Sequence, residues 1–217
     1  MNTSEPVKKK EKKEKKEIYL ASSSPRRAEL LTQMGISFER VTVDIDESCR
    51  KQEKPIEYVA RLALEKAING HQQVKDKTKP VLGSDTAIYV EAEKSDSEGE
   101  KEGLEGKILG KPQNIQDAYR MLRLLSANTH QVLTAVTLVN ENKQATIVQT
   151  SNVTMRKIKD DEIKAYWESG EPKGKAGAYA IQGKAAVFIS NIQGSYSGVM
   201  GLPIFETANL LAGFDVK

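Results

Sequence analysis

Cysteine and histidine are scarce in this chain. Its 217 residues include one cysteine, Cys49, and two histidines, His71 and His130. A disulfide framework needs several cysteines, and neither histidine has partners at the spacing of a metal site. We therefore expect a protein that folds without disulfides in a reducing cytoplasm. Cys49 lies among polar residues with no evident base, and we interpret it as incidental.

Long apolar runs and a charge excess in the body of the chain are also missing. No stretch approaches the roughly 20 apolar residues that span a bilayer, and the charged N-terminus is unlike a secretion signal, so we expect no membrane segment. Residues 1–17 hold seven lysines and four glutamates, which accounts for the net charge of +3, and the rest balances 26 basic against 26 acidic residues. This balance, with 6% aromatic residues, argues against a nucleic-acid-binding domain.

Several common catalytic signatures are absent too. The sequence contains no Walker phosphate loop, no dinucleotide glycine pattern and no nucleophile elbow. Carboxylates, lysines and arginines remain as the candidate machinery. Such groups suit metal-assisted attack of water on a phosphoanhydride better than acyl transfer.

What is present is an alternation of strand and helix patterns. Strands are predicted at about 18–22, 37–43, 80–90, 107–110, 131–139 and 145–157, with two more within 174–201, and helices at 25–34, 55–69, 114–126, 160–170 and 203–211. Gly70 is expected to end the second helix and Asp160 to cap the fourth. The mixture predicts an α/β fold with a mixed, twisted sheet and flanking helices.

Two segments differ from the rest in composition. Residues 1–17 have no apolar face and are predicted to be a disordered tail, the alternative being an arm that contacts nucleic acid. Residues 91–106 hold seven acids and two lysines and predict an acidic hairpin insertion. Residues 18–217 are otherwise expected to form one domain.

The first strand-to-helix turn has the features of a phosphate site. Ser24 can cap the helix and Pro25 suits its first position. Free N–H groups at the helix start, the hydroxyls of Ser22 and Ser24, and the adjacent Arg26 and Arg27 could bind an anion. An ordinary turn with solvated arginines is the open alternative.

Two charged residues interrupt apolar patterns. Asp85 lies in an otherwise apolar strand and should be buried unless a metal, a cation or water meets it, which makes it a candidate metal ligand or general base. A turn cap or an arginine pair is the alternative. Lys66 follows Val59 and Leu62 along the apolar stripe of the second helix; it either extends its ammonium to solvent or meets a phosphate or carboxylate.

Weaker signals complete the candidate site. Glu47, together with Asp44 and Asp46, could bind a hard cation, because magnesium takes one or two carboxylates plus water and phosphate. Solvated loop acids are the alternative. Lys111 could contact phosphate. Gln182 lies in a glycine-rich run and could present its amide to a base, or simply bond to backbone.

Taken in order, these segments resemble those of the Maf family of nucleoside triphosphate pyrophosphatases across residues 18–214. The matching segments are 21–27 (ASSSPRR), 63–67 (ALEKA), 82–86 (LGSDT), 110–112 (GKP), 129–134 (THQVLT), 174–183 (GKAGAYAIQG) and 194–203 (GSYSGVMGLP). The acidic insertion departs from the compact family pattern.

The resemblance implies a fold similar to inosine triphosphate pyrophosphatases, with two lobes around a cleft, and hydrolysis of a nucleoside triphosphate to the monophosphate and pyrophosphate with Mg²⁺ or Mn²⁺. By position, Asp85 resembles the family's proton acceptor, activating water or its metal, and Glu47 would help to hold that metal. Lys66, Lys111 and Arg26 would hold phosphate. Arg26, Thr86 and Gln182 match positions associated with substrate choice.

The run at 175–183 resembles the branch of the family that acts on dTTP and UTP, rather than the branch that favours 7-methyl-GTP. Modified pyrimidine nucleotides are further possible substrates. The resemblance also implies a homodimer. An alternative function is a nucleotide-binding regulator of septum formation in which catalysis is secondary.

Overall fold

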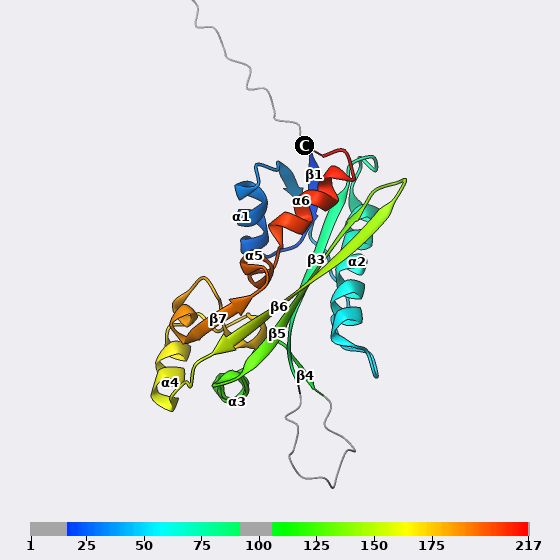
Figure 1. Ribbon diagram of the computed structural model, residues 1–217. Helices are drawn as coiled ribbons and strands as arrows, with labels where there is room; N and C mark the ends of the chain where they lie inside the picture. The colour runs from blue at the N-terminus through cyan, green and yellow to red at the C-terminus, as the bar shows by residue number, and fades with distance from the viewer. Residues whose placement is uncertain (1–16, 92–105, 217) are drawn as a thin grey trace, which may run out of the picture.

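The computed structural model describes residues 17–91 and 106–216 (Figure 1). Its strands are β1 (Ile18–Ala21), β2 (Phe38–Arg40), β3 (Val81–Val90), β4 (Lys107–Leu109), β5 (Thr129–Val139), β6 (Gln144–Met155) and β7 (Ile189–Gln193). Its α-helices are α1 (Pro25–Gln33), α2 (Pro55–Gln73), α3 (Ile115–Leu125), α4 (Asp160–Glu168), α5 (Tyr196–Met200) and α6 (Ile204–Ala212). The predicted tail, apart from Glu17, and almost all of the predicted insertion lie outside the described residues.

The strands form one mixed sheet, in the order β2-β1-β3-β5-β6-β7, with β4 pairing to β3. β1 is parallel to β2 and β3, and the remaining pairs are antiparallel. Helices flank this sheet, so the predicted α/β fold with a mixed sheet is confirmed. Within the described ranges, none of the helices combines the length and apolar character that crossing a membrane requires.

One edge of β3 is covered by two different strands with a gap between them. β1 pairs with β3 only as far as Gly83, and β4 pairs with it only from Ile88 onward. On the opposite edge, β5 pairs with β3 without interruption. In the described part of the chain, residues 84–87 therefore have no strand paired with them on the first edge. Side chains from both faces of β3 can meet in the space beside this edge.

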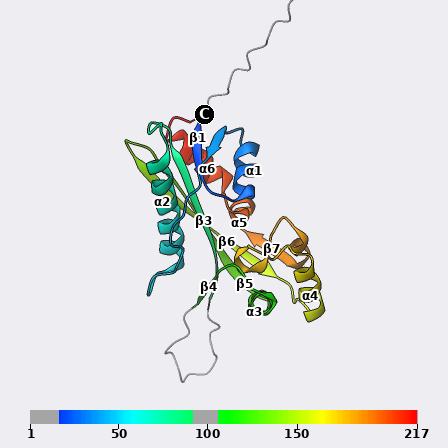
Figure 2. The ribbon, with the colours of Figure 1, turned by 180° about the vertical axis from the view of Figure 1, so that it is seen from behind.

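Helix α2 lies along the long strands β3 and β5 of the sheet (Figures 1 and 2). It packs so closely that its backbone approaches the backbone of the sheet. A Cβ atom on Gly83 would lie 2.2 Å from the carbonyl oxygen of Ala63, so only glycine fits between strand and helix. The predicted helix end at Gly70 is wrong, because α2 continues to Gln73. Gly70 instead lets the helix approach β1 and β3, since a Cβ there would lie 2.9 Å from the Cβ of Ala21.

The other helices enclose two apolar cores. One core joins α1 and α6 to β1 and the first half of β3, and the other joins α3 and α4 to the far ends of β3, β5 and β6. In Figure 1, α1, α5 and α6 gather at the upper part of the sheet and α3 and α4 at the lower part.

Three further predictions need correction. The second strand is shorter than predicted, because its partner β1 ends at Ala21. Asp160 is the first residue of α4 rather than its cap, which is Lys159. The segment 174–201 holds one strand rather than two; its first part forms the 3-10 helices Ala176–Ala178 and Lys184–Phe188. Residues 178–181 are all buried, so they lack the inside–outside alternation of a strand with one solvent face.

Candidate active site

A cavity of about 550 Å³ lies at the gap in the sheet. Its walls come from the β1–α1 turn, the centre of β3, the loop before α2, the end of β4 and the segments 174–182 and 199–201. Ten of the candidate residues line it: Ser22, Ser24, Arg26, Arg27, Glu47, Lys66, Asp85, Thr86, Lys111 and Gln182. Asp44 and Asp46 are not among its lining residues. The gap explains how Asp85 and Thr86, which point to opposite faces of β3, reach the same space.

Asp85 and Lys66 form a buried ion pair. Asp85 is 7% exposed and Lys66 is 9% exposed, and Lys66 Nζ lies 2.7 Å from Asp85 Oδ1. The Lys66 ammonium therefore does not extend to solvent, and the partner of Asp85 is a lysine rather than an arginine. Among the described residues, the Asp85 side chain accepts a hydrogen bond at Oδ1 and none at Oδ2.

Glu47 joins this pair from the loop before α2. Its Oε1 lies 2.6 Å from Lys66 Nζ and its Oε2 lies 3.6 Å from Lys111 Nζ. Partial burial raises the pKa of the Glu47 carboxyl, but the hydrogen bond and charge of Lys66, with a smaller effect of Lys111, outweigh burial and leave the pKa below its usual value. Glu47 is thus held as a carboxylate.

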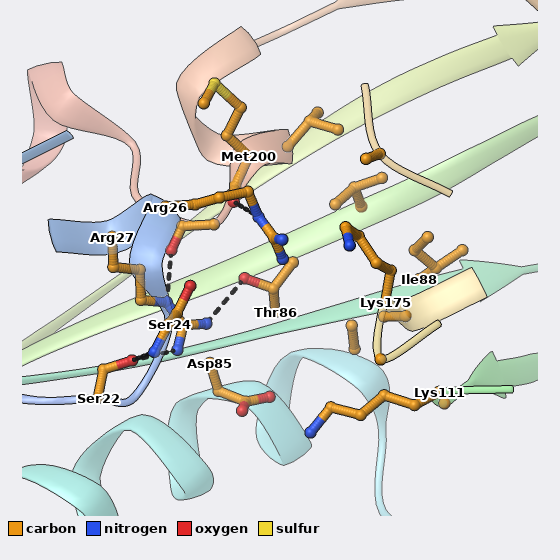
Figure 3. Close-up of a pocket in the computed structure, with 18 of the residues that line it drawn as sticks. Ser22, Ser24, Arg26, Arg27, Asp85, Thr86, Ile88, Lys111, Lys175 and Met200 are labelled. Atoms are coloured by element: carbon orange, nitrogen blue, oxygen red, sulfur yellow. Dashed lines mark hydrogen bonds between the residues drawn. The ribbon is translucent and has the colours of Figure 1, made fainter. Parts of the chain in front are cut away.

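Arg27 is fixed in the cavity wall by three hydrogen bonds (Figure 3). It donates from Nε to the Gly201 carbonyl at 2.9 Å, from Nη1 to Ser22 Oγ at 3.2 Å and from Nη2 to Thr86 Oγ1 at 3.3 Å. Burial lowers its pKa, and the charge of Asp85 acts in the opposite direction. A guanidinium has five N–H groups, so two remain for a ligand.

The hydroxyl of Thr86 serves Arg27 rather than a ligand. Thr134 Oγ1 donates its only hydrogen to the Gly198 carbonyl at 2.8 Å. Thr86 must therefore donate to Thr134 across their 3.0 Å contact, and it accepts from Arg27. No hydroxyl hydrogen of Thr86 is left for a substrate.

The Ser24 hydroxyl at the start of α1 makes no hydrogen bond to the helix. Ser24 is the N-cap with extended backbone, and it makes no capping side-chain bond. Pro25 occupies the first helical position, and Arg26 donates from Nε to the Met200 carbonyl at 3.3 Å. Burial lowers the pKa of Arg26. This geometry fits an anion at the helix start.

The description of a known family fits this chain. The family model described as Maf-like protein matches residues 17–214. The chain belongs to the Maf family. It is 43% identical over 203 residues to a dTTP/UTP pyrophosphatase of Alkalilimnicola ehrlichii, covering 92% of this chain and 93% of that protein.

Two further relatives carry the same description. A dTTP/UTP pyrophosphatase of Hydrogenovibrio crunogenus is 45% identical over 197 residues, with 91% of this chain and 95% of the relative covered. One of Pseudoalteromonas translucida is 46% identical over 197 residues, with 91% of this chain and 96% of the relative covered. The family resemblance inferred from the motifs is confirmed.

Lys175 and Tyr58 also line this Maf-family cavity, although the sequence did not single them out as candidates. Lys175 projects into it on the side of Arg26 and Thr86 (Figure 3); burial and the charge of Arg26 lower its pKa. Tyr58 also lines the cavity and donates to the Glu47 carbonyl at 2.9 Å. Tyr58 lies two helical turns before Lys66, and this spacing was the available signal.

Segment 174–182, which carries Gln182, is anchored by a buried aromatic contact between Tyr179 and His130. Tyr179 and His130 meet edge to face, and the Tyr179 hydroxyl lies 2.8 Å from His130 Nε2. Tyr179 is thus a core residue that also reaches the cavity wall.

Two carboxylates are a suitable donor set for a hard cation that also binds phosphate. Within the described ranges, there is no group of three or more His, Cys, Asp or Glu residues that could hold a metal ion. Glu47 and Asp85, bridged by Lys66, fit Mg²⁺ or Mn²⁺, which complete their coordination with water and substrate oxygens.

Proposed function

We propose that this protein hydrolyses dTTP and UTP to the nucleoside monophosphate and pyrophosphate. The names of its Maf-family relatives support the reaction and the nucleotides. The observation that carries the proposal is the division of the cavity. The carboxylates of Asp85 and Glu47 share the ammonium of Lys66, whereas Arg26 and Arg27, which also line the cavity, form no salt bridge within the described residues.

Each part of the nucleotide has a matching group in this proposal. Arg26 and Arg27, with the α1 start and its serine hydroxyls, bind the phosphate chain. Lys66 and Lys111 bind phosphate oxygens beside the carboxylates. Gln182 offers both a donor and an acceptor to the pyrimidine edge. Thr86 influences substrate choice through the position of Arg27.

In the reaction that we propose, a water oxygen bonds to the α-phosphorus and the bond from that phosphorus to the α,β-bridging oxygen breaks. Asp85 Oδ2 accepts a proton from the water, while Lys66 holds Oδ1 and orients the carboxylate. The bridging oxygen leaves with pyrophosphate, whose charge the arginines stabilise. Glu47 and Asp85 would hold Mg²⁺ or Mn²⁺, which neutralises phosphate charge and polarises the scissile bond when it is bound.

The test is pyrophosphate release from dTTP, UTP, CTP, dCTP, GTP, ATP, ITP and 7-methyl-GTP with Mg²⁺ or Mn²⁺. We expect selective hydrolysis of dTTP and UTP. Asp85→Asn should fold normally and lose at least about a hundredfold in turnover, the usual contribution of a general base. Near-wild-type turnover by Asp85→Asn would reject its role, and preference for a purine would reject the proposed specificity.

The regulator alternative has a distinct outcome in the same assay. Tight nucleotide binding with negligible turnover in saturating metal would favour a binding protein over an enzyme. The cytoplasmic location and the homodimer are predictions from sequence and resemblance.

A further inference from the structure

The loop that carries Glu47 has little backbone support. Residues 41–54, between β2 and α2, contain neither helix nor strand. Val41 N bonds to the Leu20 carbonyl at 2.9 Å where the loop begins, and Tyr58 N bonds to the Lys54 carbonyl at 2.9 Å where it ends. Between Val41 and Lys54, every hydrogen bond from the loop to α2 involves a side chain. The position of Glu47 therefore depends on side-chain contacts.

Arg61 of α2 makes the most complete of these contacts. Its Nε and Nη2 donate to the two carboxylate oxygens of Glu53 at 2.6 and 2.8 Å, and Nη2 also donates to the Ser48 carbonyl at 3.0 Å. The side chain of Arg61 is 13% exposed and that of Glu53 is 7% exposed. One guanidinium thus holds the loop at two points, on either side of Cys49 and next to Glu47.

The charges of this ion pair reinforce the contact. The hydrogen bond from Arg61 is the main reason that the pKa of Glu53 falls to about 2. A planar guanidinium can donate two parallel hydrogen bonds to the Glu53 carboxylate and a third to the Ser48 carbonyl. A lysine ammonium lacks this forked arrangement of donors. Arg61 itself is not among the cavity-lining residues.

We propose that Arg61 is a positioning residue, which holds the 41–54 loop so that Glu47 reaches Lys66 and the cavity. The proposal rests on the proposed function for its effect on turnover, because Glu47 acts there beside Asp85. Its effect on the loop does not depend on that function. The competing explanation is an ion pair that only stabilises the fold.

The only cysteine of the chain provides a probe in this same loop. Cys49 is exposed, so a nitroxide label can be attached there and its mobility read from the electron paramagnetic resonance line shape, without metal or nucleotide. We expect a more mobile spectrum in Arg61→Met than in the wild type, with at least a tenfold lower kcat/KM for UTP. Glu53→Gln, which keeps the shape of the side chain, should change both readouts in the same direction and guards against misfolding of the first variant.

Arg156→Met is the matched control. Arg156 makes a comparable paired contact with Glu162, at 3.0 and 2.7 Å, away from the cavity. This variant should leave the Cys49 spectrum and the turnover of UTP unchanged.

The proposal is overturned if both loop variants keep the wild-type spectrum, or if the loop becomes more mobile while kcat/KM stays at the wild-type value. Inactivity of the wild type towards every nucleotide would instead reject the proposed function, and the line shapes would still decide whether Arg61 holds the loop.

Discussion

At the residue scale, the positively charged side chains of the cavity are of two kinds, those that form salt bridges with its carboxylates and those that form none within the described residues. Lys66 and Lys111 lie beside Glu47 and Asp85. Arg26 and Lys175 have no carboxylate within 4.0 Å among the described residues. These two neighbouring cations are partly desolvated and form no salt bridge within the described residues, and the charge of Arg26 lowers the pKa of Lys175, so this part of the cavity is suited to a polyanion.

Lys175 is therefore expected to contribute to binding of the nucleotide. Lys175→Met should raise KM for UTP about tenfold, since a charge-assisted hydrogen bond contributes roughly 1.5–3 kcal/mol and 1.4 kcal/mol is a factor of ten. Steady-state kinetics measures the change. Lys173→Met, which removes a nearby lysine that lies over Trp167, is the control; equal KM values for the two variants would contradict the role.

His130 predicts a pH dependence of stability. Its side chain is 1% exposed, and burial lowers its pKa from 6.5 to about 4. The neutral form is thus favoured in the fold. Its contribution is complete above pH 6.5 and declines as the pH falls towards 4, because the unfolded chain binds the proton first. The loss is about 3 kcal/mol at 1.36 kcal/mol per pKa unit.

Urea unfolding of the wild type and His130→Phe between pH 7 and pH 4 measures this contribution. The free energy of unfolding should fall more steeply in the wild type, whatever the absolute stability of the variant. Parallel curves for the two proteins would show that His130 is not the group responsible.

At the element scale, the contact of β3 with α2 decides where Lys66 lies. Gly83 allows the helix to approach, and Asp85 follows two residues later on the same face of β3, opposite Lys66. The closeness of the ion pair is thus a consequence of the packing of the strand and the helix.

A methyl group at Gly83 should separate the two elements. Gly83→Ala is expected to lower the free energy of unfolding by about 1–3 kcal/mol through overpacking and to reduce turnover of UTP, because Lys66 moves away from Asp85. Thermal unfolding compares it with Gly110→Ala, where an added Cβ meets nothing within 4 Å. Equal stability of the two variants would contradict the close contact.

Local patterns predicted most of these elements and the residues that they carry. Pro55 and the apolar stripe predicted α2, and polar Asp85 in an apolar strand was a visible anomaly. Gly70 was misread because a glycine that ends a helix and a glycine that packs against a strand look the same in sequence. Lys175 was missed because its place in the cavity depends on the partly buried turn Ala176–Ala178 that follows it.

At the scale of the whole molecule, the site exists because β1 and β4 leave four residues of β3 uncovered. The sequence predicted a mixed sheet but not this gap, since strand length and pairing depend on partners far away in the chain. Among the described residues, the cavity lining has five cations and two acids, within a body that balances 26 basic against 26 acidic residues. Positive charge is therefore concentrated where a triphosphate would bind.

In the proposed reaction, water attacks the α-phosphorus of UTP in this cavity. Hydrolysis of UTP in ¹⁸O-labelled water, with the products analysed by mass spectrometry, tests this step. We expect the label to enter UMP and pyrophosphate to stay unlabelled. Label in pyrophosphate, release of UDP and phosphate, or no turnover at all would contradict the proposed reaction.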